Sequence, residues 1–197
     1  DSAGIVLDSG NSEFVVAKTK GKVDDLVAIS KDLSGKANVG MGHTRWATHG
    51  LPSDRNSHPH VSNNGKIALV HNGIIENYDT IKIMLTEKGF TFQSETDTEI
   101  LVNLIQYFMD SNSEIDFPAA VRFALNEVYG AYAITVMHDD FPGVLVVARL
   151  GSPLAIGLGE KEYFIASDAS PFVEFTKEAV YLEEGHMATI SLEKGVD

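Results

Sequence analysis

The sequence predicts an α+β fold, with strands gathered towards both ends of the chain and helices between them. Two observations predict it. Short apolar or β-branched runs, bounded by turn residues, occur before residue 72 and again after residue 130, whereas apolar residues at helical spacing fill the interval. Because strands and helices do not alternate strictly, antiparallel sheets with helices on their outer faces fit better than a doubly wound parallel sheet.

The first part of the chain is expected to hold four strands and one short helix. The turn residues Asp8–Asn11 separate the first two strands, so these strands are expected to pair as a hairpin. A long polar segment separates the third strand from the fourth, and such segments in compact domains are usually functional or mobile. The expected strands are Ser2–Leu7, Glu13–Lys18, Asn38–His43 and Lys66–His71, and the expected helix is Val23–Leu33.

Three helices are expected in the middle of the chain. Each begins with a residue that caps helices well, and apolar residues three and four positions apart follow it. A glycine at position 89 ends the first of them. The expected starts are Asn77 or Asp79 for the first helix, the capping-box pair Thr96 and Glu99 for the second, and Asp116 with Pro118 for the third.

The last part of the chain is expected to be mostly strand. A short helix is expected over Ser170–Phe175, with Ser167 and Asp168 as its structural cap. The expected strands are Ala131–His138, Val144–Arg149, Leu154–Leu158, Tyr163–Ala166, Ala179–Leu182 and His186–Ile190.

Composition limits both the architecture and the partners. A chain of 197 residues with 44% hydrophobic content is long enough for one well-buried domain, which we expect to span residues 1–197. No apolar run reaches the roughly 18–20 residues that span a bilayer, so we expect no membrane partner and a cytoplasmic location. The net charge of −13 argues against a nucleic-acid partner. The chain contains no cysteine, which excludes disulfides and thiolate metal sites.

The segment Gly42–Gly50 gathers polar groups that suit a small zwitterion. Arg45 presents a planar fork that grips a carboxylate, and Thr48 and His49 add a hydroxyl and an imidazole. Trp46 is the only tryptophan and is a candidate apolar lid. The alternative is a structural salt bridge at Arg45 and an ordinary core tryptophan.

A second segment, Asn72 and Gly73, is expected just after the strand that ends at His71. An amide nitrogen beside a glycine N–H can converge on one oxygen, which is the geometry of an oxyanion hole. The alternative is a plain Asn-Gly turn, although the residues that follow do not restart an alternating strand.

Asp97 is expected in the first turn of the second helix, where the helix dipole favours a carboxylate without any function. The functional alternative is that Asp97 holds an ammonium group. Five histidines gather in the first half of the chain, but none has the spacing of a zinc motif, so hydrogen bonding in loops is the favoured interpretation. They are His43, His49, His58, His60 and His71.

The chain resembles the glutaminase domain of the glucosamine-6-phosphate synthase family, which belongs to the type 2 glutamine amidotransferases. The resemblance extends over nearly the whole chain in the expected order. It is carried by His43–Gly50, His58–His60, His71–Asn77, Ser94–Glu99, Gly130–Tyr132, Gly151–Leu154, Phe164–Asp168 and Leu182–Gly185.

The resemblance implies an N-terminal-nucleophile fold, a four-layer αββα sandwich with two antiparallel sheets. It also implies that a cysteine thiolate attacks the glutamine side-chain amide and that ammonia leaves. Asn72 and Gly73 would then stabilise the oxyanion. Substrate-binding roles are implied for Arg45 with the α-carboxylate, Asp97 with the α-amine, Thr48 and His49 in the pocket, Trp46 in the closing loop, and His58 behind the site.

In that family the nucleophile is an N-terminal cysteine whose α-amine, with a pKa of about 8, acts as the base. Asp1 matches a point shortly after the family's first strand and helix, so the segment that bears the cysteine is missing and the sequence as written is expected to be inactive. The resemblance calls for no cofactor and no metal. It implies three partners: glutamine, a sugar-isomerase domain on the same full-length chain, and a second copy in a homodimer.

Three alternatives stay open at this point. The first is a non-catalytic module that binds a glutamine-like ligand. The second is the glutaminase domain of another type 2 amidotransferase, such as amidophosphoribosyltransferase. The third is a metal-dependent hydrolase built on the histidine cluster.

Overall fold

The computed structural model describes residues 1–10, 13–31, 33, 37–46 and 48–197. Its largest element is an antiparallel six-stranded sheet with the strand order β12-β11-β7-β6-β5-β4. The strands of this sheet are β4 (His60–Val61), β5 (Ile67–Ile75), β6 (Gly130–His138), β7 (Val144–Leu150), β11 (Met187–Ser191) and β12 (Gly195–Val196).

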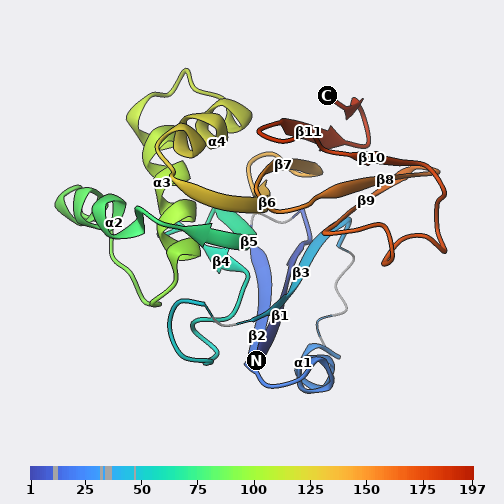
Figure 1. The fold of residues 1–197 in the computed structure, drawn as a ribbon, viewed down its shortest axis with the longest axis horizontal. Coiled ribbons are helices and arrows are strands. Elements are labelled where there is room, and N and C mark those ends of the chain that lie inside the picture. The colour runs from blue at the N-terminus through green and yellow to red at the C-terminus, as the bar shows by residue number, and fades with distance from the viewer. Residues whose placement is uncertain (11–12, 32, 34–36, 47) are drawn as a thin grey trace.

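Three helices cover one face of the six-stranded sheet (Figure 1). They are α2 (Tyr78–Glu87), α3 (Asp97–Ser111) and α4 (Phe117–Asn126). Alternate strand residues such as Ile134 and Val136 of β6 pack against α3 residues such as Leu101 and Leu104. Removal of these side chains from water holds the helices on the sheet.

The opposite face of the sheet packs against two smaller antiparallel sheets. One has the order β2-β1-β3 and the other β10-β8-β9. Helix α1 (Val23–Ser30) packs outside β1 and β2 (Figure 1). The strands are β1 (Ser2–Asp8), β2 (Phe14–Lys20), β3 (Val39–Arg45), β8 (Ala155–Gly159), β9 (Glu162–Ala166) and β10 (Ala179–Tyr181).

The layers therefore run helix, sheet, sheet, helix, which confirms the α+β prediction. The second β-layer differs from expectation because it is divided into two sheets. Within the described residues, β3 and β9 each have one unpaired edge. Both strands border a single cavity of about 1250 Å³.

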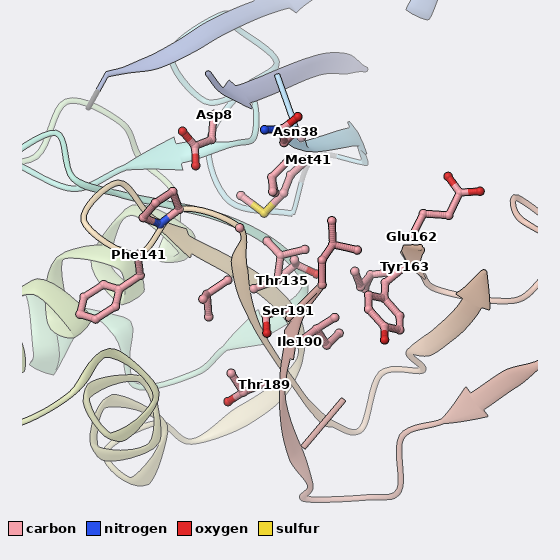
Figure 2. A pocket seen from close by; sticks show the side chains of 18 of the residues that line it. Asp8, Asn38, Met41, Thr135, Phe141, Glu162, Tyr163, Thr189, Ile190 and Ser191 are labelled. Atoms are coloured by element: carbon pink, nitrogen blue, oxygen red, sulfur yellow. The ribbon is translucent and has the colours of Figure 1, made fainter. Parts of the chain in front are cut away.

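Figure 2 shows this cavity, which we call the β3–β9 cavity. Met41 of β3 and Tyr163 of β9 contribute side chains to its walls, and Thr135 and Ile190 from the six-stranded sheet contribute to its floor. A smaller cavity of about 490 Å³ shares several of its lining residues and reaches the end of β3.

Most predicted elements are present, with shifts of a few residues at their ends. The two-residue strands β4 and β12 were not predicted, because two residues carry no periodicity. The helix expected over Ser170–Phe175 is wrong, since this segment forms successive turns. In the expected helix Val23–Leu33 the helical part ends at Ser30, and residue 32 lies outside the described residues. The same holds for Asn11 in the predicted hairpin turn.

The capping box expected at Thr96 and Glu99 is half formed. The Thr96 hydroxyl accepts the N–H of Glu99 at 3.3 Å, as expected. The Glu99 carboxylate instead accepts the N–H groups of Gln93 and Ser94, which ties the preceding loop to α3. Asp116 caps α4 as predicted, by accepting the N–H of Ala119.

No helix in the part of the chain that the structure describes is long and apolar enough to cross a membrane.

Candidate active site

Asn72 and Gly73 lie inside β5, whereas the sequence predicts that the strand ends just before them. The strand continues to Ile75, and Gly73 pairs with Tyr132 of β6. Gly73 has a φ of 136°, and a Cβ there would lie 2.0 Å from the carbonyl oxygen of Ala131. The predicted placement after the strand was wrong because glycine lets β5 run through a conformation that other residues avoid.

The side chain of Asn72 is exposed at one end of the smaller cavity. Its Oδ1 lies 2.7 Å from Nε2 of His43, which comes from β3. Its Nδ2 donates to Oγ of Ser167, just after β9, at 2.9 Å. Residues from three separate strand regions therefore meet at this amide.

Behind Asn72 lies a network of neutral histidines. His58 stacks on His43 with ring centroids 4.3 Å apart, and Oγ1 of Thr98 lies 3.1 Å from both Nε2 of His58 and Nδ1 of His71. Burial lowers the pKa of all three imidazoles. They are therefore uncharged at neutral pH.

The hydrogen bonds assign the tautomers of this network. Nδ1 of His58 accepts the backbone N–H of His71, so the proton of His58 is on Nε2 and is donated to Thr98. Thr98 then donates to Nδ1 of His71, whose Nε2 proton points to the carbonyl oxygen of Ala131 at 3.4 Å. The network thus ends at the backbone that packs against Gly73.

Arg45 ends β3 and is buried, with 5% of its surface exposed. Its Nη2 donates to the backbone carbonyl oxygens of His49 and Gly50, which fixes the following loop. Its Nη1 is buried and has no hydrogen-bond partner among the described residues. Burial lowers the pKa of Arg45 and the nearby Asp97 carboxylate opposes this shift, so the guanidinium keeps its charge.

Asp97 is the first residue of α3 and joins this helix to β5. Its Oδ2 accepts the N–H of Ile75 at 2.9 Å, and its Oδ1 accepts the N–H of Thr98 at 3.0 Å. It also lies 3.9 Å from Nδ1 of both His49 and His71. Asp97 therefore lies in the first turn of α3, as expected, and it also lies beside the site.

The structure brings most of the predicted site residues together, but not all. The contacts above join six of these residues into one connected region: Arg45, His49, His58, Asn72, Gly73 and Asp97. Trp46 is 87% exposed and Thr48 is exposed, so neither adds to the walls described above. Ala47, between them, lies outside the described residues.

Sequence reasoning missed two residues of this region. The sequence predicts hydrogen bonding within a loop for His43, whereas in the structure this residue lies on β3 and contacts Asn72 on β5. For Ser167 the sequence predicts a structural role, as a helix cap together with Asp168. The Asp168 carboxylate does accept the N–H of Ser170, but no helix follows, and the Ser167 hydroxyl binds Asn72. No local signal could have identified Ser167, because it is 95 positions from its partner.

A candidate metal-binding group lies elsewhere. Among the described residues, only His138, Asp139 and Asp140 bring three ligand atoms within 4.8 Å of one another. In this group Nδ1 of His138 accepts the N–H of Asp140, and the Asp140 carboxylate pairs with Lys66 at 2.7 Å. These two residues therefore already have protein partners.

Comparison with known sequences gives a consistent set of relatives. A family profile described as a glutamine amidotransferase domain matches residues 30–193. Glutamine–fructose-6-phosphate aminotransferase (isomerizing) of Bacteroides thetaiotaomicron is 52% identical over 97% of the chain, and that of Chlorobaculum tepidum is 50% identical over 97%. The chain spans about a third of the length of these relatives, 31% in each case.

Comparison with solved structures agrees on the fold. Glutamine phosphoribosylpyrophosphate amidotransferase from B. subtilis aligns with a TM-score of 0.81 at 28% identity, covering 100% of this chain and 42% of that one. The allosteric regulatory enzyme of purine biosynthesis aligns with a TM-score of 0.83 at 29% identity, with the same coverage.

Proposed function

The chain belongs to the glutamine amidotransferase domain family, and from this premise we propose that it hydrolyses the side-chain amide of glutamine and releases ammonia. One observation carries the proposal: the Asn72 amide lines a cavity, Gly73 follows it directly in β5, and a buried cation (Arg45) and a buried anion (Asp97) lie nearby. Such a set of groups fits an amino acid with a reactive amide.

Asn72 and Gly73 form the proposed oxyanion hole. Attack on the amide carbon places negative charge on the carbonyl oxygen, and donors already aimed at that oxygen stabilise it without reorganisation. The Asn72 side chain supplies one N–H, and the Gly73 backbone supplies the second. Because Gly73 has no side chain, the substrate can approach the strand closely.

Arg45 and Asp97 bind the two charged ends of glutamine in this proposal. The buried Nη1 of Arg45, which has no partner among the described residues, suits a carboxylate oxygen. Asp97 lies close enough to lower the electrostatic cost of the Arg45 charge and suits an ammonium group. His49 lies beside Asp97, and the loop with Trp46 and Thr48 would close over the ligand, with His58 behind it.

The thiol nucleophile must come from outside these 197 residues, which contain no cysteine. A terminal cysteine has its own base, since an α-amine with a pKa of about 8 accepts a proton at neutral pH. We place the segment that carries this cysteine in the β3–β9 cavity. Two unpaired strand edges border that cavity, and it adjoins the cavity that reaches Asn72.

We further propose that the ammonia serves amino transfer to fructose 6-phosphate, the reaction named for the relatives that are 52% and 50% identical. A sugar-isomerase domain on the same full-length chain, a homodimer and a cytoplasmic location complete this proposal. The product is then glucosamine 6-phosphate. The solved structures are less similar in sequence, at 28% and 29%, so phosphoribosyl transfer is the weaker candidate.

Steady-state release of glutamate and ammonia from glutamine tests the proposal, measured on the protein as its gene encodes it. Asn72→Ala is expected to lower kcat by about 10²–10³, because one oxyanion donor is lost. Asn126→Ala, an exposed asparagine at the end of α4, is the matched control and should leave kcat unchanged. Full glutaminase activity in Asn72→Ala would overturn the proposed function. Glutamine binding without any turnover in the wild type would favour the non-catalytic module.

A further inference from the structure

The Asn72 amide is held from two sides by residues far from it in the sequence. His43 Nε2 faces its Oδ1, and Ser167 Oγ accepts from its Nδ2. Resting on the proposed function, we propose that His43 and Ser167 are positioning residues that keep the amide nitrogen of Asn72 turned towards the reacting carbonyl oxygen.

The donors and acceptor of this amide show why two anchors matter. An asparagine side chain has one oxygen acceptor and two N–H donors. The oxygen faces His43, and one N–H is donated to Ser167. One N–H therefore remains, and it is the group available to an oxyanion.

Rotation of the amide by 180° would reverse this arrangement. Oδ1 would then face the developing negative charge, and two partial negative charges would repel. Ser167 alone cannot prevent the rotation, because a hydroxyl both donates and accepts. His43 can prevent it, provided that its Nε2 carries the proton.

The surroundings of His43 favour the proton on Nε2. Its Nδ1 is buried without a partner among the described residues, and a buried orphan acceptor is tolerated better than a buried orphan N–H. Burial lowers the pKa of His43, although its contact with the Asn72 side chain opposes this shift. The ring is thus a neutral donor towards Asn72.

The His43 ring is also fixed in place. It lies on β3 and stacks on His58 at an interplanar angle of 30°. His58 in turn is held by Thr98 at the start of α3. The orientation of one catalytic amide therefore depends on contacts from β3, the β4 region, α3 and the segment after β9.

Replacement of His43 by leucine and by glutamine separates positioning from packing. Glutamine carries its amide nitrogen at about the position of imidazole Nε2, whereas leucine carries no donor. We expect His43→Leu to lower kcat for glutamine by about 10–100-fold with KM within about threefold, and His43→Gln to keep most of kcat. Ser167→Ala should lower kcat by about 3–10-fold and serves as the second variant if His43→Leu does not fold.

A double-mutant cycle with Asn72→Ala separates positioning of the amide from general structural support, because a loss of structural support would lower kcat in both backgrounds. Once the amide is absent, His43→Leu should cause no further loss of kcat. His186→Leu, which replaces an exposed histidine, is the control and should match the wild type in both backgrounds.

The outcomes are distinguishable. If Asn72→Ala lowers kcat but His43→Leu and Ser167→Ala do not, the positioning proposal is overturned and the proposed function survives. The positioning proposal is also overturned if His43→Leu lowers kcat by the same factor with and without the Asn72 amide. It is likewise overturned if a folded His43→Gln variant has no higher kcat than His43→Leu. If Asn72→Ala itself is fully active, both proposals fall.

Discussion

At the scale of single residues, Arg45 combines a structural contact with a free binding group. One nitrogen of its guanidinium holds the loop through two carbonyl oxygens, while Nη1 lies buried without a partner among the described residues. A planar fork can serve both contacts at once, whereas a lysine ammonium is a single point charge. This difference makes the role of Arg45 testable with a change that keeps the charge.

We predict that Arg45→Lys raises KM for glutamine by about 10–100-fold with a smaller change in kcat, because the fork to the α-carboxylate is lost. Steady-state kinetics with glutamine measure both constants. Arg122→Lys, an exposed arginine over the ring of Phe123, is the control. A fall in kcat at constant KM would place Arg45 in the chemistry rather than in substrate binding.

The residue types, together with the resemblance of the chain to a known family, predicted site roles for Asn72, Gly73, Arg45 and Asp97, because each of these residues stands in a recognisable local motif. His43 belongs to such a motif too, but its partner does not follow from spacing. It meets Asn72 across 29 positions and Ser167 meets Asn72 across 95. Contacts of this length depend on strand register, which no single sequence states directly.

At the scale of elements, β5 shows where a local rule fails. The Asn-Gly pair favours a turn, yet the structure keeps both residues in a nine-residue strand paired with β6. Cross-strand pairing and the burial of Ile75 outweigh the turn preference. The close approach of Ala131 then makes glycine necessary at position 73.

We predict that Gly73→Ala lowers the free energy of unfolding by roughly 2–4 kcal/mol, since the new Cβ would lie 2.0 Å from the Ala131 carbonyl oxygen at an unfavourable φ. Urea denaturation of the two proteins measures the difference. Gly65→Ala is the matched control, because Gly65 also has a positive φ but a Cβ there would meet no atom within 4 Å. Equal losses in both variants would show that the contact with Ala131 is not the constraint.

At the scale of the whole molecule, buried histidines link stability to pH. Burial lowers the pKa of His58 and His60 well below the usual value, and also that of His43, His71 and His138. In the unfolded chain the same groups take up protons near pH 6.5. The unfolded state therefore binds more protons below that pH, and stability is lost as pH falls.

We predict that the free energy of unfolding decreases between pH 7 and pH 5, by up to about 1.4 kcal/mol per pH unit for each such histidine. Urea denaturation across this range measures the slope. His60→Gln is expected to give a shallower slope, whereas His186→Gln, at an exposed histidine, should keep that of the wild type. Unchanged stability down to pH 5 would contradict the burial of neutral imidazoles.

The periodicity of the sequence predicted antiparallel sheets with helices on their outer faces, and the resemblance implied four layers, but neither predicted the division of the second β-layer. Pairing between β3 and β9 is a relation between segments more than a hundred residues apart, and the apolar pattern of each strand is the same with or without it. The consequence is two unpaired edges along one cavity of about 1250 Å³. Unpaired edges of this kind recruit strands from other chains.

We therefore predict that a polypeptide consisting of residues 1–197 alone self-associates through the β3–β9 cavity, with a molar mass in light scattering that rises with concentration. Tyr163→Lys places a charge in the cavity wall and should reduce the association, because burying an unpaired ammonium is costly. Tyr181→Lys, on β10 at the opposite edge of the same small sheet, should leave it unchanged. If Tyr181→Lys abolishes association and Tyr163→Lys does not, the chains associate through the edge of β10. That outcome would remove the support for the β3–β9 cavity as the binding site of a further strand.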